Sequence, residues 1–527
     1  MKATSQKECI FFVGGRGFNS VGSTKAGGCT KQWWDSQPNI DTDAGKSSAM
    51  AKLMGAGGQA IISGTFIVNS FDSIEKTITF EEDDSGDFDG VEVGMTLYGS
   101  NNVSYDVFDS DGVYEIIDRG SDWIKVKAGP HEDINVDDDA DIVIAGAWSG
   151  IGEIMSYADA SQYSQVVYIN KQFVPLTPYN TSGWGGNLDR NSRLFIEGFH
   201  TVPGDMNVGG GYHQSALDAY GNGIDEARCV TVDCVNSGDG FIWDDSVNIT
   251  FRNIYAKRPQ GGKAGFALTA SAAGDAVGCE FINCKSTKDD VNHNSIGIGG
   301  YFGFADSCSI KGFYSNNGAN CVRVSGDNNS VDGCVLDPTT HGIVMHDHLE
   351  WPGSNTVRGN LIIGGDNGVV QGGHGIVENN TLVGQAVASL AANSDVGVPC
   401  VEMNNNILMP AEVAKAIGGF DGTADHKINL LGQNNLLWTT TGTPVSLESL
   451  INLHADCQMP DMSTWLFGNP QFADLAGGDF RCSNKNVLLG GLADAAGNET
   501  VIGAVGQRWQ FVSRAKVSNR GRLSIIR

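Results

Sequence analysis

A short pattern of apolar and polar positions recurs between residues 190 and 440. It reads as an apolar residue, two variable positions, and then Asn, Cys or a large apolar residue. The first positions are Thr231, Phe251, Phe281, Ile310, Val331, Val357, Val377, Met403 and Leu431, and they lie 20 to 30 residues apart. Repeats of about 20 to 50 residues indicate stacked units that cannot bury a core singly. Short units with Gly and Asn turns predict a β-solenoid rather than stacked helices.

A second pattern lies in phase with the first. Short apolar strands follow Gly240, Gly265, Gly342 and Gly368. The offset from Val331 to Gly342 and from Val357 to Gly368 is 11 residues in both cases. Each coil is therefore predicted to hold at least two strands at a fixed separation, with its variable length in loops.

Half of the twelve cysteines fall in two columns of this register. Cys234, Cys284 and Cys334 occupy the fourth position, and Cys229, Cys279 and Cys308 lie two residues before the first. Buried thiols inside the coils are the expected explanation. The alternative is a metal site at the pairs Cys229/Cys234 and Cys279/Cys284, although zinc sites generally use shorter spacings. Asn occupies the fourth position in later coils, which predicts an internal Asn ladder of Asn360, Asn380, Asn406 and Asn434.

The N-terminal part has a different pattern. Between residues 61 and 148, short strands such as FIVNSF, KTITF, MTLYG, GVYEII, WIKVKA and DIVIAGA alternate with acidic turns. They predict a small β-barrel-like module. A helix is expected from Ser47 to Gly55, in a segment that caps this module or joins it to the first coil.

Composition and charge narrow the classes of protein. Glycine contributes 71 of 527 residues, which disfavours a helical protein because each helical Gly costs about 1 kcal/mol relative to Ala. The net charge of −27 opposes binding to nucleic acid or to an anionic membrane. No run of 18 apolar residues predicts a membrane span. The apolar run Ile10 to Val13 is too short for a signal peptide, so we expect folding in a cytoplasm with reduced thiols.

The repeat resembles the right-handed parallel β-helix of pectin-lyase-like proteins. The resemblance covers roughly residues 150 to 505 and includes VVYIN (166–170), LFIEGF (194–199) and the closing segment NPQFADLAGGDFR (469–481) with VIGAVG (501–506). The module at 61–148 resembles a β-barrel found in phage particle proteins. We therefore expect an all-β chain with four parts: a cap or attachment segment (1–60), the acidic module (61–148), a right-handed parallel β-helix (149–506) and a basic tail (507–527).

The resemblance suggests catalytic candidates. Asp244 and Asp245 follow a glycine-led strand, and His374 lies in a Gly-His-Gly, as in polygalacturonase-like hydrolases. In that family the elements lie on neighbouring coils, whereas here 129 residues separate Asp244 from Gly373. No matching Arg-Ile-Lys follows, so the alternative is that these are surface polar residues.

The densest polar cluster surrounds the end of one glycine-led strand. It contains His346, Asp347, His348, Glu350 and Trp351, close to His341. His346 and His348 would share one face of a strand, where they would bind a glycan or a metal ion, and Trp351 would stack on a sugar. The alternative is a solvated loop between coils.

No cofactor is expected. The acidic runs Glu81 to Asp84 and Asp137 to Asp141 would suit Ca2+, but neither fits the EF-hand pattern of ligands, and solvated turns are the simpler interpretation. No other metal site is predicted.

The basic tail contrasts with the acidic module. Residues 507–527 carry six bases and no acid, whereas residues 61–150 carry 21 acids and 4 bases. We expect the tail to bind a partner or a neighbouring subunit. Its bases are Arg508, Arg514, Lys516, Arg520, Arg522 and Arg527. The alternative is a disordered end.

Three functions fit these features. The first is a structural bacteriophage virion protein, such as a spike, fibre or head-decoration protein, whose β-helix shaft binds host-surface glycan. The resemblance implies a homotrimer with other virion proteins as partners, and it leaves catalysis open. The second is a polysaccharide lyase or glycoside hydrolase, as in a depolymerase tailspike acting on acidic glycans. The third is a bacterial adhesin, which would ordinarily need an export signal.

Overall fold

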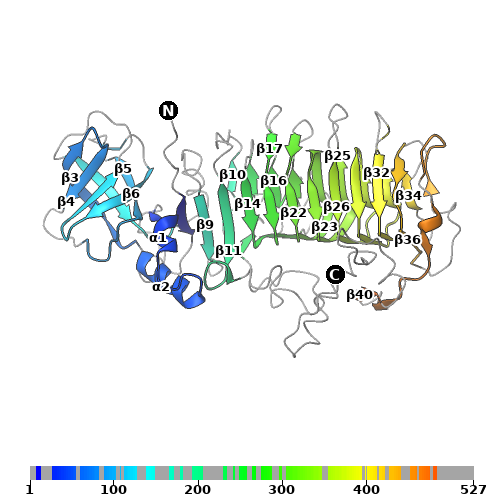
Figure 1. Cartoon of the computed structure of the whole chain (residues 1–527), viewed down its shortest axis with the longest axis horizontal. Helices are drawn as coiled ribbons and strands as arrows, with labels where there is room; N and C mark the ends of the chain where they lie inside the picture. The colour runs from blue at the N-terminus through cyan, green and yellow to red at the C-terminus, as the bar shows by residue number, and fades with distance from the viewer. Residues whose placement is uncertain are drawn as a thin grey trace. The chain divides into compact units, whose positions relative to one another are not determined.

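The chain is described by a computed structural model. The described residues are 8–13, 26–54, 60–81, 88–101, 107–108, 112–127, 138–148, 165–170, 179–181, 193–205, 230–233, 241–243, 248–257, 264–268, 275–287, 296–298, 304–346, 354–393, 398, 400–411, 415–419, 421, 427–440, 451–459, 462–474 and 479–482. They are predominantly β-strand, with two α-helices and one 3-10 helix in the part described, so the predicted all-β class is confirmed (Figure 1).

The chain divides into two compact units. The first comprises Met1–Leu176, Asn187–Val208 and Arg228–Thr231, and the second comprises Thr177–Gly186, Gly209–Ala227 and Val232–Arg527. None of the helices within the described residues has the length and apolar composition that a membrane span requires.

The first unit contains a closed antiparallel barrel, as the strand pattern predicts. Around the barrel, β3 pairs with β4, β4 with β7, β7 with β6, β6 with β5, β5 with β8, and β8 again with β3. The strands are β3 (Ile62–Asp72), β4 (Thr77–Glu81), β5 (Met95–Asn101), β6 (Gly112–Arg119), β7 (Trp123–Lys127) and β8 (Asp139–Ile144). Closure leaves no free sheet edge.

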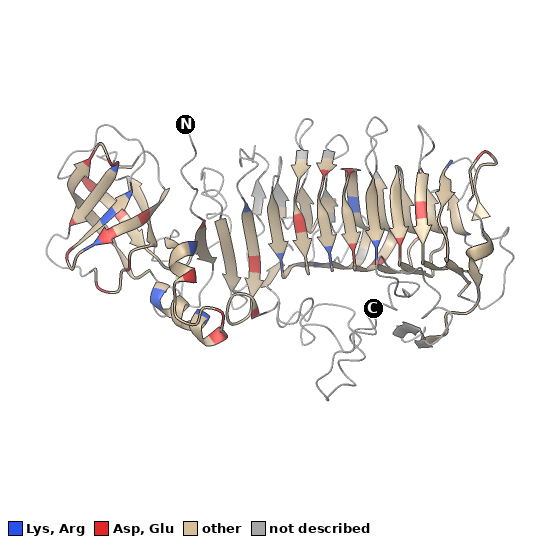
Figure 2. Cartoon of the chain, in the orientation of Figure 1, with Lys and Arg blue, Asp and Glu red and all other residues tan. Residues whose placement is uncertain are grey.

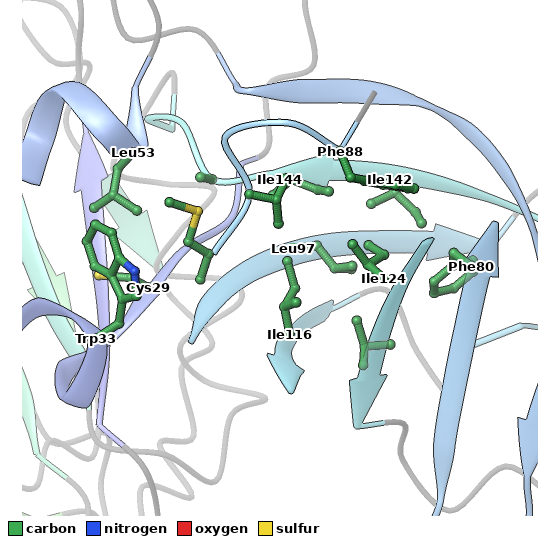
Figure 3. Close-up of a cluster of buried hydrophobic side chains, with 14 of the residues drawn as sticks. Cys29, Trp33, Leu53, Phe80, Phe88, Leu97, Ile116, Ile124, Ile142 and Ile144 are labelled. Atoms are coloured by element: carbon green, nitrogen blue, oxygen red, sulfur yellow. The ribbon is translucent and has the colours of Figure 1, made fainter. Parts of the chain in front are cut away.

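Alternate residues of these strands fill the barrel. The inward side chains are large and apolar, because successive side chains of a strand point to opposite faces. Figure 3 shows Phe80, Phe88, Leu97, Ile116, Ile124, Ile142 and Ile144 packed together, and all are buried. The intervening positions carry charged residues, such as Lys125 on β7 and Asp141 on β8.

Two helices and a small parallel sheet complete the first unit. Helix α1 (Lys31–Asp35) follows β2 (Gly28–Thr30), which pairs with β5 and with β1 (Cys9–Val13). Strand β9 (Gln165–Asn170) lies between β1 and β11 (Leu194–Phe199), parallel to both. Helix α2 (Asp43–Leu53) begins four residues earlier than expected, because the hydroxyl of Thr42 accepts the N–H of Gly45 at 3.1 Å and caps the helix.

The second unit is a stack of parallel coils, in which each coil contributes strands to successive ladders (Figure 1). The first ladder contains the four-residue repeat. Its strands are β14 (Ile249–Arg252), β18 (Glu280–Ile282), β22 (Ser309–Lys311), β24 (Ser330–Asp332), β26 (Asn355–Arg358), β29 (Gly375–Glu378), β32 (Cys400–Asn404) and β35 (Asn429–Leu431). The predicted register from Phe251 to Met403 is confirmed residue for residue.

Two further ladders run beside the first in a 20-stranded sheet. One contains β15 (Ile254–Lys257), β19 (Lys285–Thr287), β23 (Tyr314–Asp327), β25 (Val335–His346), β27 (Leu361–Ile363), β30 (Thr381–Val383), β33 (Ile407–Met409), β36 (Leu436–Leu437) and β38 (Leu466–Phe467). The other shares β23 and β25 and adds β10 (Tyr179–Thr181), β13 (Phe241–Trp243), β16 (Phe266–Leu268), β20 (Ile296–Ile298), β28 (Asn367–Gln371), β31 (Ala388–Ala392), β34 (Lys415–Gly419) and β37 (Ile451–Asn452).

The glycine-led strands align as predicted. Phe241 pairs with Phe266, and Ile343 with Val369. The remaining strands are β12 (Val230–Asp233), β17 (Asp275–Val277), β21 (Phe304–Asp306), β39 (Phe472–Asp474) and β40 (Asp479–Cys482), and the 3-10 helix is η3 (Met462–Thr464).

The third position of the repeat turns the chain between the first two ladders. In the eight coils from β14 to β35 this residue has a positive φ, between 53° and 65°. The residues are Asn253, Asn283, Gly312, Gly333, Gly359, Asn379, Asn405 and Asn434. Only Gly, and to a lesser degree Asn, adopts this left-handed conformation readily, so the turn explains why the repeat uses these two residues.

The fourth position forms the predicted Asn ladder. The side-chain amide of Asn380 donates to the Val357 carbonyl at 2.9 Å and to Oδ1 of Asn406 at 3.0 Å. Its own oxygen accepts from the backbone N–H and the side-chain amide of Asn360. Both amide protons and both lone pairs of the buried side chain therefore have partners.

The last rung differs from the prediction. Asn406 bonds to Asn435 at 2.8 Å, and Asn434 occupies the left-handed third position instead. The pairing of the strands explains why the predicted position is wrong by one residue. The repeat aligns Leu431 with Met403, but Leu431 pairs with Glu402 and is 42% exposed. The next residue, Gly432, has no room for a side chain, because a Cβ there would lie 2.0 Å from the Met403 carbonyl oxygen.

Both cysteine columns continue as asparagines. Among the described cysteines, Cys279, Cys284, Cys308 and Cys334 are buried as predicted, and Cys229 and Cys234 lie outside the described residues. The N–H of Cys308 donates to Oδ1 of Asn329 at 3.0 Å, and the N–H of Asn329 donates to Oδ1 of Asn355 at 3.0 Å. This second, shorter Asn ladder was not predicted.

Charged residues occur at intervals along the strands of the first ladder (Figure 2). Arg358 lies 2.8 Å from Asp332 and 3.9 Å from Glu378, and Lys311 lies 3.2 Å from Glu280. Hydrogen bonding to Asp332 raises the pKa of the Arg358 guanidinium. These pairs are partly exposed, so we expect each to add little to stability.

Replacement of Asn380 by Ala tests the ladder. The variant leaves the Val357 carbonyl and the donors of Asn360 without their partners, and we expect a loss of about 3 kcal/mol in the free energy of unfolding. Denaturant titration measures it. Arg358→Ala is the control and should lose less than about 1 kcal/mol. Equal losses in the two variants would contradict the ladder's role.

Candidate functional site

A pocket of about 270 Å3 lies on the sheet formed by β23, β25 and β31. Five of its seven lining residues are polar, but most of the lining surface is apolar, and the residues come from three parts of the chain. The lining residues are Ala319, Asn320, Arg323, Thr340, His341, Val344 and Asn393. The pocket is slightly smaller than the range of about 300 to 1,000 Å3 typical of small-molecule sites, so it suits a single small ring.

Within one strand, two residues that lie three positions apart both line this pocket. The two positions between them face the interior of the coil. A Cβ on Gly342 would lie 2.5 Å from the Ile362 side chain and 2.6 Å from the Gly368 carbonyl oxygen. Gly342 therefore packs inward, and Ile343 is fully buried beside it. The flanking residues His341 and Val344 line the pocket.

The parallel register carries this arrangement from coil to coil. Asn320 pairs with His341, and His341 pairs with Asn367. In the neighbouring column, Arg323 pairs with Val344. Each coil thus contributes one polar side chain and one side chain three residues later, and the pocket exists only while the coils stay in register.

His341 is neutral at neutral pH. The loss of solvent on burial lowers the pKa of its imidazole below the ordinary value of 6.5, and the Asp366 carboxylate and the Thr340 backbone oppose this shift only in part. The side-chain nitrogen of Asn367 lies 3.3 Å from Nδ1 of His341. As the amide donates this hydrogen bond, Nδ1 is the acceptor and Nε2 carries the proton.

Apolar side chains form the floor beside these polar groups. Val344, Val370, Ala388 and Ala391 make a buried cluster on the same columns. An apolar surface next to Arg323, His341 and two amides can contact the C–H face of a sugar ring while the polar groups bind its hydroxyl or acidic substituents. The guanidinium of Arg323 is suited to carboxylate or sulfate oxygens.

Four of the polar pocket residues were not predicted from the sequence. They are Asn320, Arg323, Thr340 and Asn393. The sequence did contain one indication of this polar column. His341 and Asn367 immediately precede Gly342 and Gly368, the glycines of the second pattern. Asn320 could not be found this way, since Cys321 stands where the other coils have glycine.

The predicted His cluster lies almost wholly outside the described residues. His346 is the last residue of β25 and pairs with Ser325, but its side chain is not described. Asp347, His348, Glu350 and Trp351 lie outside the described residues. Of the histidines in this region, only His341 has a described side chain, and it lines the pocket.

Of the catalytic candidates, Asp244 and Asp245 lie outside the described residues. His374 is exposed, and its Nδ1 accepts the N–H of Cys400 at 3.1 Å. Its carbonyl oxygen accepts the side-chain amide of Gln371 at 3.3 Å. His374 does not line the pocket, and these contacts hold the turn between β28 and β29 against β32.

The described residues include no group of three His, Cys, Asp or Glu placed to hold a metal ion. Burial raises the pKa of the Cys284 thiol to about 12, and a hydrogen bond with Cys308 together with burial raises that of Cys279. High thiol pKa values disfavour the thiolate that metal binding requires. Of the predicted acidic runs, only Glu81 and residues 138–141 are described.

The partner-binding candidates of the basic tail lie outside the described residues. They are Arg508, Arg514, Lys516, Arg520, Arg522 and Arg527.

Comparison with known proteins gives no family. No protein-family model and no curated protein matches the chain. The chain is similar to the tailspike protein gp49 from Pseudomonas phage LKA1, with 9% identity and a TM-score of 0.20 over 78% of this chain and 64% of the tailspike. It is also similar to a glycoside hydrolase, with 10% identity and a TM-score of 0.17 over 80% of this chain and 76% of that one. Likenesses this low support no assignment.

The electrostatics of His341 can be tested by titration. NMR of the histidine side chains, with the His341 signal assigned by its absence in His341→Gln, should give a pKa below 6.5. Asp366→Asn should lower it further. Since the folded state resists protonation, wild-type stability should fall as pH drops through 6.5 toward the folded pKa, and His341→Gln should lose less stability there. A pKa at or above 6.5 would contradict the burial of this side chain.

Proposed function

We propose that this chain is a structural protein of a bacteriophage particle that binds host-surface glycan at the His341 pocket. The observation that carries the glycan part is the pocket itself, where Arg323, His341 and Asn320 line the same hollow as the apolar side chain of Val344. Polar groups next to an apolar floor are the arrangement that a sugar ring needs.

The virion part rests on the sequence resemblance. The barrel-like module and the closing segment resemble those of phage particle proteins, and the stack of parallel coils is suited to a stiff shaft. In this proposal the coils wind to the right, as about 98% of parallel crossover connections do. The chain assembles as a homotrimer with other virion proteins, after folding in the host cytoplasm.

A second candidate function is polysaccharide lyase or hydrolase activity. The arginine beside a neutral His341 favours it, because the guanidinium of Arg323 can bind the carboxylate of an acidic sugar while the Nε2–H of the imidazole donates a hydrogen bond to the sugar oxygen that leaves. Incubation with acidic polysaccharides distinguishes the two functions. Unsaturated or shortened products that disappear in His341→Gln would support catalysis, and intact polysaccharide would support binding alone.

Glycan binding can be measured with immobilised bacterial surface polysaccharides. Arg323→Ala removes the cation of the pocket, and we expect at least a tenfold loss in affinity, the effect of one hydrogen bond to a charged group. Lys311→Ala on the first ladder is the matched control and should bind like the wild type. If the two variants bind equally well, the glycan is not held at this pocket.

The last residue of β25 and those that follow it extend the proposed site. We place His346, Asp347, His348, Glu350 and Trp351 in the same glycan-binding surface, because they continue directly from Met345. The double variant His346→Ala/His348→Ala should weaken glycan binding several-fold without altering metal content. Unchanged binding and unchanged metal content together would show that this cluster has no such role.

The basic tail is proposed to bind an acidic surface in the assembled particle. Deletion of residues 508–527 removes all six bases of the tail and should reduce trimer formation or incorporation into virions. Mass measurement by light scattering and immunodetection in purified particles report the two effects. Normal assembly of the shortened chain would rule out this docking.

A further inference from the structure

Two aspartates lie side by side where neighbouring coils turn toward the first ladder. Asp306 is the last residue of β21, Asp327 is the last residue of β23, and the two pair in parallel register. Paired residues of parallel strands point to the same face, and the strands lie about 4.8 Å apart. The two carboxylates are therefore close neighbours, and like charges placed directly opposite each other destabilise a sheet.

Hydrogen bonds direct the side chain of Asp306 toward the coil that carries Asp327. Nδ2 of Asn328, the residue that follows Asp327, donates to Oδ1 of Asp306 at 3.0 Å. The hydroxyl of Ser307 donates to the same oxygen at 3.3 Å. The backbone closes the same corner, because the N–H of Ser307 donates to the carbonyl oxygen of Asp327 at 3.3 Å. These contacts bring the two aspartates together at one corner of adjacent coils.

Asp327 is buried, and one of its carboxylate oxygens has no partner. The residue is 5% exposed, and within the described part of the chain its Oδ1 accepts no hydrogen bond. Neither aspartate forms an ion pair with a lysine, arginine or histidine of the described residues. A carboxylate removed from water costs free energy unless a donor or a positive charge compensates it. The buried oxygen and the adjacent second carboxylate together indicate a bound cation.

We propose that Asp306 and Asp327 bind a Ca2+ ion. Ca2+ takes about six to eight oxygen ligands, which in proteins come from carboxylates, side-chain amides, backbone carbonyls and water. The two carboxylates and the side-chain oxygen of Asn328 provide the protein ligands, and water completes the shell. All of these ligands are oxygen atoms, which suit a hard cation rather than zinc. With only two carboxylates, we expect a Kd on the order of 1 mM.

The bound ion joins two coils of the stack. It replaces the repulsion between the paired carboxylates by attraction, so the pairing of β21 with β23 depends on Ca2+. The site is separate from the His341 pocket, whose lining includes neither aspartate. The proposal therefore does not depend on glycan binding.

Thermal unfolding of the full-length chain in CaCl2, compared with NaCl of equal ionic strength, tests this proposal. The melting temperature of the wild type should rise as Ca2+ increases to about 10 mM. Asp327→Asn, and Asp306→Asn as a second variant, should lose most of this rise. Asp332→Asn is the matched control, because it removes the same charge from a residue paired with Arg358, and it should keep the rise.

Two further measurements separate a cation site from a structural role of the carboxylate. Without Ca2+, Asp327→Asn should unfold at or above the wild-type temperature, because it removes an uncompensated buried charge. With a Kd near 1 mM, about 10 mM CaCl2 should slow hydrogen exchange of the Ser307 amide about tenfold in the wild type. The same treatment should leave this amide unchanged in Asp327→Asn.

Three results would overturn the proposal. The first is a wild-type melting temperature that does not respond to Ca2+. The second is the same Ca2+ response in the wild type and in both aspartate variants, which would place the ion elsewhere. The third is exchange of the Ser307 amide that Ca2+ does not slow in the wild type.

Discussion

Hydrogen bonds between neighbouring coils are the interaction on which the second unit depends. Each buried asparagine of the ladder bonds only to the coils on either side of it, so it fixes their register and adds nothing within its own coil. The left-handed third position turns the chain so that the fourth residue points inward. Because a buried amide is costly without all its partners, slippage of one coil by one residue would break bonds in three coils.

The outer surfaces follow from this register. Columns of paired residues run along the stack, and a column becomes a site when successive coils contribute suitable side chains. Asn320, His341 and Asn367 form one such column at the pocket, and Ile363, Val383 and Met409 form another in an apolar cluster of the second ladder. The first presents polar groups to a ligand. The second packs apolar side chains of successive coils against one another, so neighbouring ladders of one solenoid serve binding and stability separately.

The sequence predicted the coils better than the site. The repeat positions from Phe251 to Met403 were correct because inward side chains must be apolar, Cys or Asn. The final coil was wrong by one residue, because Leu431 fits the apolar pattern although its side chain is exposed, and Gly432 carries no hydrophobic signal. The pocket residues Arg323 and Asn393 were missed, since they lie 70 residues apart and meet only through the pairing of the coils. The tertiary register, rather than any local motif, creates the site.

Amide hydrogen exchange of the full-length chain tests most directly whether the ladder holds the coils together. We predict that the backbone amides of Asn360, Asn380 and Asn406 exchange among the slowest in the chain and with similar opening free energies, because each donates to the next rung. Asn328, exposed in a turn between coils, should exchange far faster. Exchange of Asn380 at the rate of Asn328, or with an opening free energy well below those of its neighbours, would contradict a ladder that joins the coils.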